Sequence, residues 1–379
     1  MNRRTVVRTI GAAGAGVSLA GCFTRDGDEP VDDSEIDDPQ PDEPDYGGTL
    51  RVATYRSMVT GPNPAGPWLE ETFLETYPDA DLEWVVPDDG VEHYIRRGEY
   101  DTTIDVDVLL GFTVGDLARI DERVGDGELL RELNLKRIDG HERIRDEVAL
   151  DDPHGRALAY DAGYVSLVYD ETVLEAPETF DDLLASAYAE TMLAQHPSHS
   201  LPGQAFFLWT IKTMGAADAF TYWEDLVANG VELRNTWSGT YYDGYLHQTR
   251  PMVVSYSSDP VFAASDGRDP ARHRVAFPND EGYMLPEGMG IFEAAPEPDL
   301  AYAFLEFLLS SETQLELARR NVQFPAVGDD SIGPRPLFEE DARRPPDAIA
   351  TGYTDLQGQL EGWLTEWDER FGSAVDDPR

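Results

Sequence analysis

The stretch Thr49-Leu50-Arg51-Val52-Ala53-Thr54-Tyr55 alternates apolar and polar side chains, which predicts a β-strand that opens the folded body. A helical pattern follows over residues 68–77, and a second strand is predicted over residues 82–86. A second helix is predicted from Val91, and a third strand over residues 104–110. This β-α-β-α-β order is typical of an α/β fold, in which helices cover a parallel sheet.

Each of these three strands is followed by a loop, at residues 55–61, 88–90 and 111–115. Because the carboxyl ends of parallel strands meet at one edge of a sheet, the three loops are expected to lie together. Ligands of open α/β sheets bind at that edge, so a binding site is expected there.

The rest of the body continues the mixed pattern. Strands are predicted over residues 157–169, 251–256 and 283–292, and helices over residues 179–187, 201–214, 216–227, 299–309 and 354–371. The body has roughly 330 residues, which is long for a single core and predicts two lobes.

The first 22 residues have the features of an export signal. Arg3 and Arg4 form a twin-arginine pair, an uncharged run follows, and Leu19-Ala20-Gly21-Cys22 is typical of a lipobox. The run is shorter than the ~20 residues of a membrane-spanning helix. Residues 1–22 are therefore predicted to be a twin-arginine lipoprotein signal, with lipid attached to Cys22. The alternative is an ordinary signal peptide with an incidental cysteine.

Residues 23–47 are rich in Asp, Glu, Pro and Gly, so they are predicted to form a disordered acidic linker between the lipid anchor and the body. The whole chain is acidic, with 74 Asp and Glu against 29 Lys and Arg and a net charge of −45. Such a chain repels nucleic acid and anionic membrane surfaces. Since the acidic excess runs along the whole chain, it indicates adaptation to high salt, as in a halophilic archaeon; the alternative is a cationic partner.

Several short motifs of the body follow one another at a recognisable spacing. They are Thr54-Tyr55, Asp89-Gly90-Val91, Asp107-Val108-Leu109-Leu110-Gly111, Tyr160-Asp161-Ala162-Gly163-Tyr164, Ser200-Leu201-Pro202-Gly203, Leu208-Trp209, Trp237-Ser238, Val254-Ser255-Tyr256-Ser257-Ser258-Asp259-Pro260, Phe304-Leu305-Glu306-Phe307-Leu308 and Glu366-Trp367. In this order they resemble the solute-binding proteins of ABC importers, and most of all the thiamine-binding family. The resemblance covers most of residues 48–372.

The resemblance implies a two-lobe, class II periplasmic-binding-protein-like α/β fold, with mixed sheets, flanking helices and two crossing hinge strands. It implies one lobe at residues 48–162 plus 283–340, a second at 163–282, and a C-terminal helical segment at 341–379. It also implies a monomeric, non-enzymatic lipoprotein without cofactor or metal, held on the extracellular face of the membrane. There it would capture thiamine or a thiamine phosphate and deliver it to an ABC permease.

Individual site residues follow from the same resemblance. The positions that match ligand-binding positions of the family are Tyr55, Asp89, Gly90, Ser200, Trp237, Tyr256 and Phe262. Two positions depart from the family: Phe262 stands for a tyrosine and Val322 for a tryptophan. Both replacements bear on which ligand is bound.

The residue types suit a flat organic cation, because aromatic faces attract cations and a carboxylate such as Asp89 pairs with them. Ser200 stands at a helix start, where free N–H groups favour a hydroxyl or phosphate oxygen. A simpler interpretation makes Tyr55 and Tyr256 ordinary strand-end aromatics, and Asp89 and Ser200 helix caps. Trp237 lies in a polar loop, where a large aromatic residue is harder to explain by packing.

Two other classes of function remain open. Tyr241 and Tyr242, helped by Asp243 and His93, could hold ferric ion, as paired tyrosines do in iron-binding members of the superfamily. Another small cationic solute is a further alternative. An extracellular hydrolase finds little support, because the chain has no Gly-x-Ser-x-Gly, phosphate-loop or His-Glu-x-x-His motif, and its single cysteine lies in the signal.

Overall fold

The computed structural model describes residues 44–61, 63–125, 129–328 and 342–376, all within the unit Pro44–Arg379. The predicted signal with Cys22, and the predicted linker up to residue 43, lie outside the described residues. Residues 44–47 carry no helix or strand. Within the described residues, no helix combines the length and apolarity that a membrane crossing requires.

The strands form a mixed sheet. Their bounds are β1 Gly48–Ala53, β2 Ala80–Val85, β3 Val108–Phe112, β4 Leu158–Tyr169, β5 Met192–Gln195, β6 Glu232–Arg234, β7 Met252–Tyr256, β8 Arg274–Ala276, β9 Glu281–Ile291, β10 Phe324–Pro325, β11 Asp347–Ile349 and β12 Val375–Asp376. The strand order is β12-β6-β5-β7-β4-β9-β3-β1-β2, with β8 and β10 paired to β4 and β11 paired to β9. Because β1 pairs parallel with both β2 and β3, the predicted parallel β-α-β-α-β unit is confirmed.

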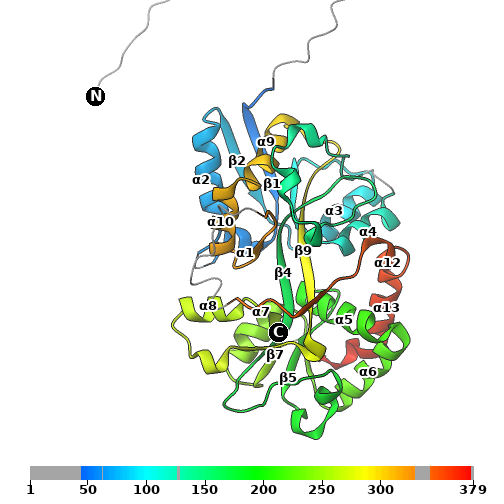
Figure 1. Ribbon diagram of the computed structural model, residues 1–379. Helices are drawn as coiled ribbons and strands as arrows, with labels where there is room; N and C mark the ends of the chain where they lie inside the picture. Colours follow the sequence, from blue (N-terminus) through cyan, green and yellow to red (C-terminus); the bar gives the residue numbers. More distant parts are fainter. Residues whose placement is uncertain (1–43, 62, 126–128, 329–341, 377–379) are drawn as a thin grey trace, which may run out of the picture. The chain divides into compact units, whose positions relative to one another are not determined.

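Helices flank this sheet (Figure 1). Their bounds are α1 Arg56–Val59, α2 Gly66–Thr76, α3 Val91–Glu99, α4 Val114–Arg123, α5 Leu201–Met214, α6 Ala216–Ala228, α7 Trp237–Thr240, α8 Asp259–Ser265, α9 Pro298–Leu308, α10 Ser311–Arg320, α12 Tyr353–Leu356 and α13 Leu360–Phe371. The helices predicted over residues 201–214, 216–227 and 299–309 are confirmed to within one residue.

Three predicted elements differ from the structure. Strand β3 begins at Val108, because the buried carboxylate of Asp107 accepts the backbone N–H groups of Arg51 and Glu297 at 2.8 and 2.6 Å. The helix predicted over residues 179–187 consists of two short 3-10 turns, Asp181–Leu184 and Ser186–Tyr188. The helix predicted over residues 354–371 is divided into α12 and α13 around Gly358, which has a φ of 71°.

Strands β4 and β9 connect the two ends of the sheet (Figure 1). They pair antiparallel from Leu158 with Met289 to Val165 with Tyr283. Beyond this shared stretch, β4 pairs with β7 and β8 through its last residues, and β9 pairs with β3. Each of the two strands therefore belongs to both ends of the sheet, as expected of crossing hinge strands.

The C-terminal segment ties the two ends together on the helical side. Helix α13 packs against both α4 and α6. Its fully buried Trp367 meets the ring of Trp223 edge to face, with centroids 5.5 Å apart. Tyr353 of α12 donates to the buried carboxylate of Asp121 on α4.

Candidate functional site

Tyr55 lies where the sequence predicts, directly after β1 at the carboxyl edge of the sheet. It is half-buried, and its hydroxyl lies 3.1 Å from the hydroxyl of Tyr160 and accepts from Asn321 Nδ2 at 2.7 Å. Gly111, at the end of β3, has a φ of 89°, and a Cβ there would overlap the Tyr55 ring. The absence of a side chain at Gly111 therefore makes room for the ring of Tyr55.

The most unusual feature beside Tyr55 is a pair of buried acids in the crossing strands, Asp161 of β4 and Glu287 of β9. The two residues are direct register partners across the antiparallel ladder and are 1% and 3% exposed. We call them the carboxyl pair. Glu287 Oε2 accepts from Tyr160 Oη at 2.7 Å, and Asp161 Oδ2 accepts from Asn321 Nδ2 at 3.1 Å. The other oxygen of Asp161 is buried and has no hydrogen-bond partner among the described residues.

Burial sets the protonation of this cluster. It raises the pKa of Asp161 well above its usual value, and the nearby charge of Glu287 raises it further. Burial also raises the pKa of Glu287. The same cause raises the pKa of the Tyr55 and Tyr160 hydroxyls, so both remain neutral. The cluster is a set of neutral hydroxyls around two acids that cannot readily both ionise.

The second aromatic group lies at the other end of the sheet, where α7 follows β6. Trp237 is half-buried, its Nε1 donates to Ser255 Oγ of β7 at 3.0 Å, and its ring stacks on Tyr241. The ring of Tyr256, the last residue of β7, meets Trp237 at 62° with centroids 6.2 Å apart. Phe262 of α8 lies behind, with its ring 6.4 Å from that of Tyr241.

Tyr256 connects the two groups. A Cβ on Gly163 of β4 would lie 3.1 Å from the Tyr256 ring and 2.7 Å from Gln323 Oε1, so the glycine admits both side chains. The negative charges of Glu287 and Asp161 add to burial in raising the pKa of Tyr256. We call Tyr55, Tyr256 and Trp237 the three rings: Tyr256 contacts Trp237, and Tyr55 reaches the carboxyl pair through Tyr160 and Asn321.

The predicted polar residues have local contacts. Asp89 is exposed and forms an ion pair with Arg96 of α3, and Gly90 is the N-cap of that helix without a side-chain cap. Ser200 caps α5, because its Oγ accepts the backbone N–H of Gly203 at 3.4 Å. Among the described residues, no direct contact joins Asp89 or Ser200 to the three rings, so the simpler capping interpretation accounts for the contacts of Ser200.

The tyrosine pair of the iron alternative is divided between core and surface. Tyr241 is fully buried and packs on Trp237, while Tyr242 is 39% exposed. His93 packs edge to face on Tyr94 of α3. In the part of the chain that the structure describes, no three His, Cys, Asp or Glu side chains are grouped to hold a metal ion. The geometry therefore gives the paired tyrosines a packing role.

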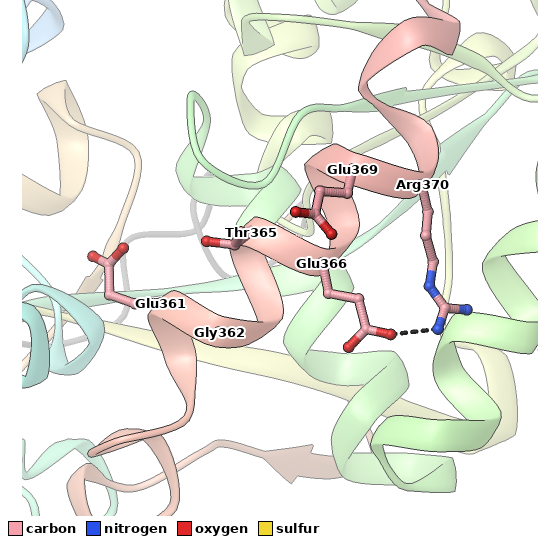
Figure 2. Close-up of a pocket in the computed structure, with 6 residues that line it drawn as sticks. All are labelled: Glu361, Gly362, Thr365, Glu366, Glu369 and Arg370. Atoms are coloured by element: carbon pink, nitrogen blue, oxygen red, sulfur yellow. Dashed lines mark hydrogen bonds and ion pairs between the residues drawn. The ribbon is translucent and has the colours of Figure 1, made fainter.

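Two hollows lie apart from the three rings. One, of about 220 Å³, lies between the start of α4, α5 and β9, and its lining includes Gly115, Gln204 and Leu285. The other lies along α13, and Figure 2 shows its lining of Glu361, Gly362, Thr365, Glu366, Glu369 and Arg370, with an ion pair between Glu366 and Arg370. None of the predicted site residues lines either hollow.

Sequence reasoning missed the carboxyl pair and Asn321. In a chain so rich in acids, a carboxylate carries little information by itself. A usable signal existed, however, because Asp161 and Glu287 are acids within otherwise apolar strand segments, Leu158–Tyr169 and Glu281–Ile291. Buried acids in such strands are rare unless they are paired or functional.

The fold and the cluster define a two-lobe binding protein of the class II periplasmic type. The family model described as bacterial extracellular solute-binding protein matches residues 123–345, and the chain belongs to this family. The thiamine-binding periplasmic proteins of Salmonella typhimurium and Escherichia coli are each 25% identical over 323 residues, covering 84% of this chain and 92% of theirs.

More distant similarities concern other ligands or the fold alone. A putative 2-aminoethylphosphonate-binding periplasmic protein of Salmonella typhimurium is 24% identical over 222 residues, covering 54% of this chain and 58% of its own. A solved periplasmic thiamin binding protein superposes with a TM-score of 0.70 at 22% identity, over 87% of this chain and 96% of its own. The apo ferric ion-binding protein A of Pasteurella haemolytica superposes with a TM-score of 0.68 at 16% identity, over 87% and 99%.

Proposed function

We propose that this protein captures thiamine or a thiamine phosphate outside the cell and delivers it to the permease of an ABC importer. The observation that supports the proposal is the buried carboxyl pair, with the Tyr55 hydroxyl linked to it through Tyr160 and Asn321. Thiamine joins a permanently charged thiazolium to a flat aminopyrimidine. Each aromatic face that such a cation contacts contributes roughly 0.5–2 kcal/mol, and the acids beneath add attraction. The relatives named as thiamine-binding proteins support the same ligand.

The remaining predicted residues are assigned to the far end of the ligand. Ser200 lies at the N-terminus of α5, a helix of 14 residues whose free N–H groups favour a phosphate or hydroxyl oxygen. Asp89 and Gly90 lie at the start of α3 and would approach the ligand when the lobes close. Closure turns on β4 and β9, with residues 48–162 plus 283–340 as one lobe and 163–282 as the other.

The location follows from the N-terminal sequence. Export by the twin-arginine route, lipid on Cys22 and the acidic linker would hold a monomeric binding protein on the outer face of the membrane. Substitution of Cys22 by serine should release the protein into the medium, measured by fractionation of cells grown in high salt. Retention of the Cys22→Ser variant in the membrane fraction would contradict the anchor.

Isothermal titration calorimetry in molar salt tests the ligand. We expect heat with thiamine or one of its phosphates, and none with ferric citrate or 2-aminoethylphosphonate. Silence with thiamine, thiamine monophosphate and thiamine diphosphate would end the thiamine proposal. Binding of a different organic cation would then favour the second candidate, a small cationic solute other than thiamine, for which the carboxyl pair is also suited.

A further inference from the structure

The carboxyl pair is costly for the free protein. Asp161 and Glu287 face each other across the central ladder and are almost fully buried. Two like charges directly opposite on neighbouring strands repel, and a buried carboxylate needs a charge partner or several hydrogen bonds. Within the described residues, neither acid forms an ion pair with Lys, Arg or His. The two crossing strands therefore hold a pair of acids that can accept a positive charge. Among the described residues, no side chain supplies that charge by an ion pair.

Among the described residues, the side chains that donate hydrogen bonds to the pair are neutral. Tyr160 donates to Glu287 and its hydroxyl lies beside that of Tyr55, and burial keeps both hydroxyls neutral; the negative charge of Asp116 on α4 raises the pKa of Glu287. The amide of Asn321 donates to Asp161 from the segment after α10.

Two atoms are left without partners at this place. Oδ1 of Asp161 and Oε1 of Gln323 are both buried and accept no hydrogen bond from the described residues. Asp161 is 1% exposed and Gln323 is 7% exposed, and Gln323 Oε1 lies beside Gly163, two residues after Asp161 on β4. A buried acceptor without a donor is destabilising, so these atoms mark where hydrogen-bond donors of a ligand would contribute most.

We propose that Asp161 and Glu287 together bind the positively charged, hydrogen-donating part of the ligand, and that the pair releases one proton when the cation enters. The O–H bond of one carboxylic acid breaks, the proton passes to the solvent buffer, and the resulting carboxylate stays to pair with the ligand cation. This inference rests on the proposed function for the identity of the ligand, but its chemistry holds for any organic cation at this site.

The proton makes the site selective for charge. A neutral ligand leaves the pair in its singly protonated form and gains only the contacts of the rings. A cation exchanges with the proton, so the second carboxylate becomes stable only when the positive charge is present. Binding of the cation should therefore tighten roughly tenfold for each pH unit while the pair still holds its proton in the free protein.

Calorimetry in two buffers of different ionisation enthalpy measures this release directly. In molar salt at pH 6, thiamine should displace close to one proton per molecule bound to the wild-type protein. Asp161→Asn and Glu287→Gln should each bind at least about tenfold more weakly and release almost none. Glu281→Gln is the matched control: it lies on the same strand and accepts from Trp209 and Thr213, but away from the pair. This control should bind thiamine and release a proton as the wild type does. Binding of thiamine to the wild-type protein without proton release would overturn the inference.

An infrared measurement on the free protein keeps the inference testable if thiamine does not bind. At pH 6 carboxyl groups with an ordinary pKa of about 4 are ionised, so the protonated carboxyl band should arise from the buried acids with a raised pKa, which are the carboxyl pair and Asp107. The part of the band that comes from the pair should be lost in the double variant Asp161→Asn, Glu287→Gln and persist in Glu281→Gln, with folding of each variant checked by thermal unfolding. No such band in wild type would overturn the inference. If the band is present but thiamine gives no heat, the proposed ligand is wrong, and choline and N-methylpyridinium then serve as cation probes. Proton release on binding of either probe supports the inference. If neither probe binds, the inference is overturned.

Discussion

The rings of Trp237 and Tyr241 lie face to face, with centroids 4.9 Å apart and planes inclined by 12°. Tyr241 is fully buried, while Trp237 is half-buried, so the tyrosine supports one face of the indole. The hydrogen bond from Trp237 Nε1 to Ser255 fixes the ring in its plane at 3.0 Å. An aromatic surface held in this way loses little freedom when a flat ligand stacks on it, which favours affinity.

Replacement of Trp237 by alanine should therefore weaken binding of the cationic ligand by roughly two- to thirtyfold, because a stacked aromatic face is worth roughly 0.5–2 kcal/mol. The fold should persist, since Tyr241 remains packed in its own cluster with Tyr245 and Val253. Titration calorimetry measures the affinity, and circular dichroism in molar salt measures the fold. Trp237→Phe is the control, because it keeps a ring on Tyr241 and should retain most of the affinity. Unchanged affinity in the alanine variant would remove Trp237 from the site.

Gly111→Ala should displace the Tyr55 ring. The new Cβ would overlap the ring, and the φ of 89° is strained for alanine, so we expect a loss of about 1–3 kcal/mol in the free energy of unfolding together with weaker binding. Denaturant unfolding in molar salt and ligand titration measure the two effects. Gly362→Ala on α13 has no atom within 4 Å of its Cβ and should lower neither quantity. Equal stability of the two variants would show that the Tyr55 ring can move aside without cost.

Much of the fold follows from local patterns in the sequence. The strand at residues 49–55 and the helices over residues 201–214 and 216–227 have clear periodicity and capping signals, so their positions could be predicted. The position of Tyr55 could be predicted for the same reason, since a residue just after a parallel strand must lie at the carboxyl edge. The break at Gly358 was missed because a glycine within an apolar periodic pattern does not by itself end a helix.

The carboxyl pair could not be predicted in the same way. Asp161 and Glu287 are brought together by the register of β4 on β9, which joins segments far apart in the chain. That register depends on the packing of both ends of the sheet, and no short-range pattern specifies it. The link through Tyr256 likewise depends on Gly163, whose missing side chain becomes meaningful once Gln323 and Tyr256 are known to lie beside it.

The free energy of unfolding should fall as the pH rises, because burial raises the pKa of both acids of the carboxyl pair. Because the folded pKa of Asp161 and Glu287 is raised above the unfolded values of about 4, the folded state holds more protons than the unfolded chain above that pH. The contribution of the pair to stability is therefore fully present below pH ~4 and is lost as pH rises through the folded pKa. Denaturant unfolding at a series of pH values should show a smaller decline in Asp161→Asn than in wild type. Identical slopes would mean that the pair ionises freely in the folded protein.

Arg156 should be a strong structural determinant at the end of the sheet that contains β1. It is 1% exposed, and its guanidinium donates to Asp121 at 2.5 Å and to Asp152 at 2.8 Å. Arg156→Met leaves two acids without their cation in a buried place, which should cost about 3–5 kcal/mol of unfolding free energy. Arg370→Met removes exposed pairs with Glu366 and Glu224 and should cost less than about 1 kcal/mol. Similar losses in the two variants would argue that the buried triad is hydrated.

The net charge of −45 predicts that the fold requires salt. At an ionic strength of 1 M the screening length is about 3 Å, so repulsion among surface carboxylates is largely suppressed, whereas at 0.01 M it extends to about 30 Å. Ion pairs such as Arg119 with Glu92 and Arg123 with Glu99 offset part of this repulsion, but acids outnumber bases 74 to 29. We therefore expect far-ultraviolet circular dichroism and tryptophan fluorescence to report unfolding on dialysis from molar potassium chloride into dilute buffer, and refolding when the salt is restored.

Dialysis at pH 4, where many carboxylates are protonated, should lower the salt concentration that the fold needs, because protonation removes the same repulsion. A protein that kept its full signal in dilute buffer at pH 7 would show that its acidic surface serves a purpose other than adaptation to salt.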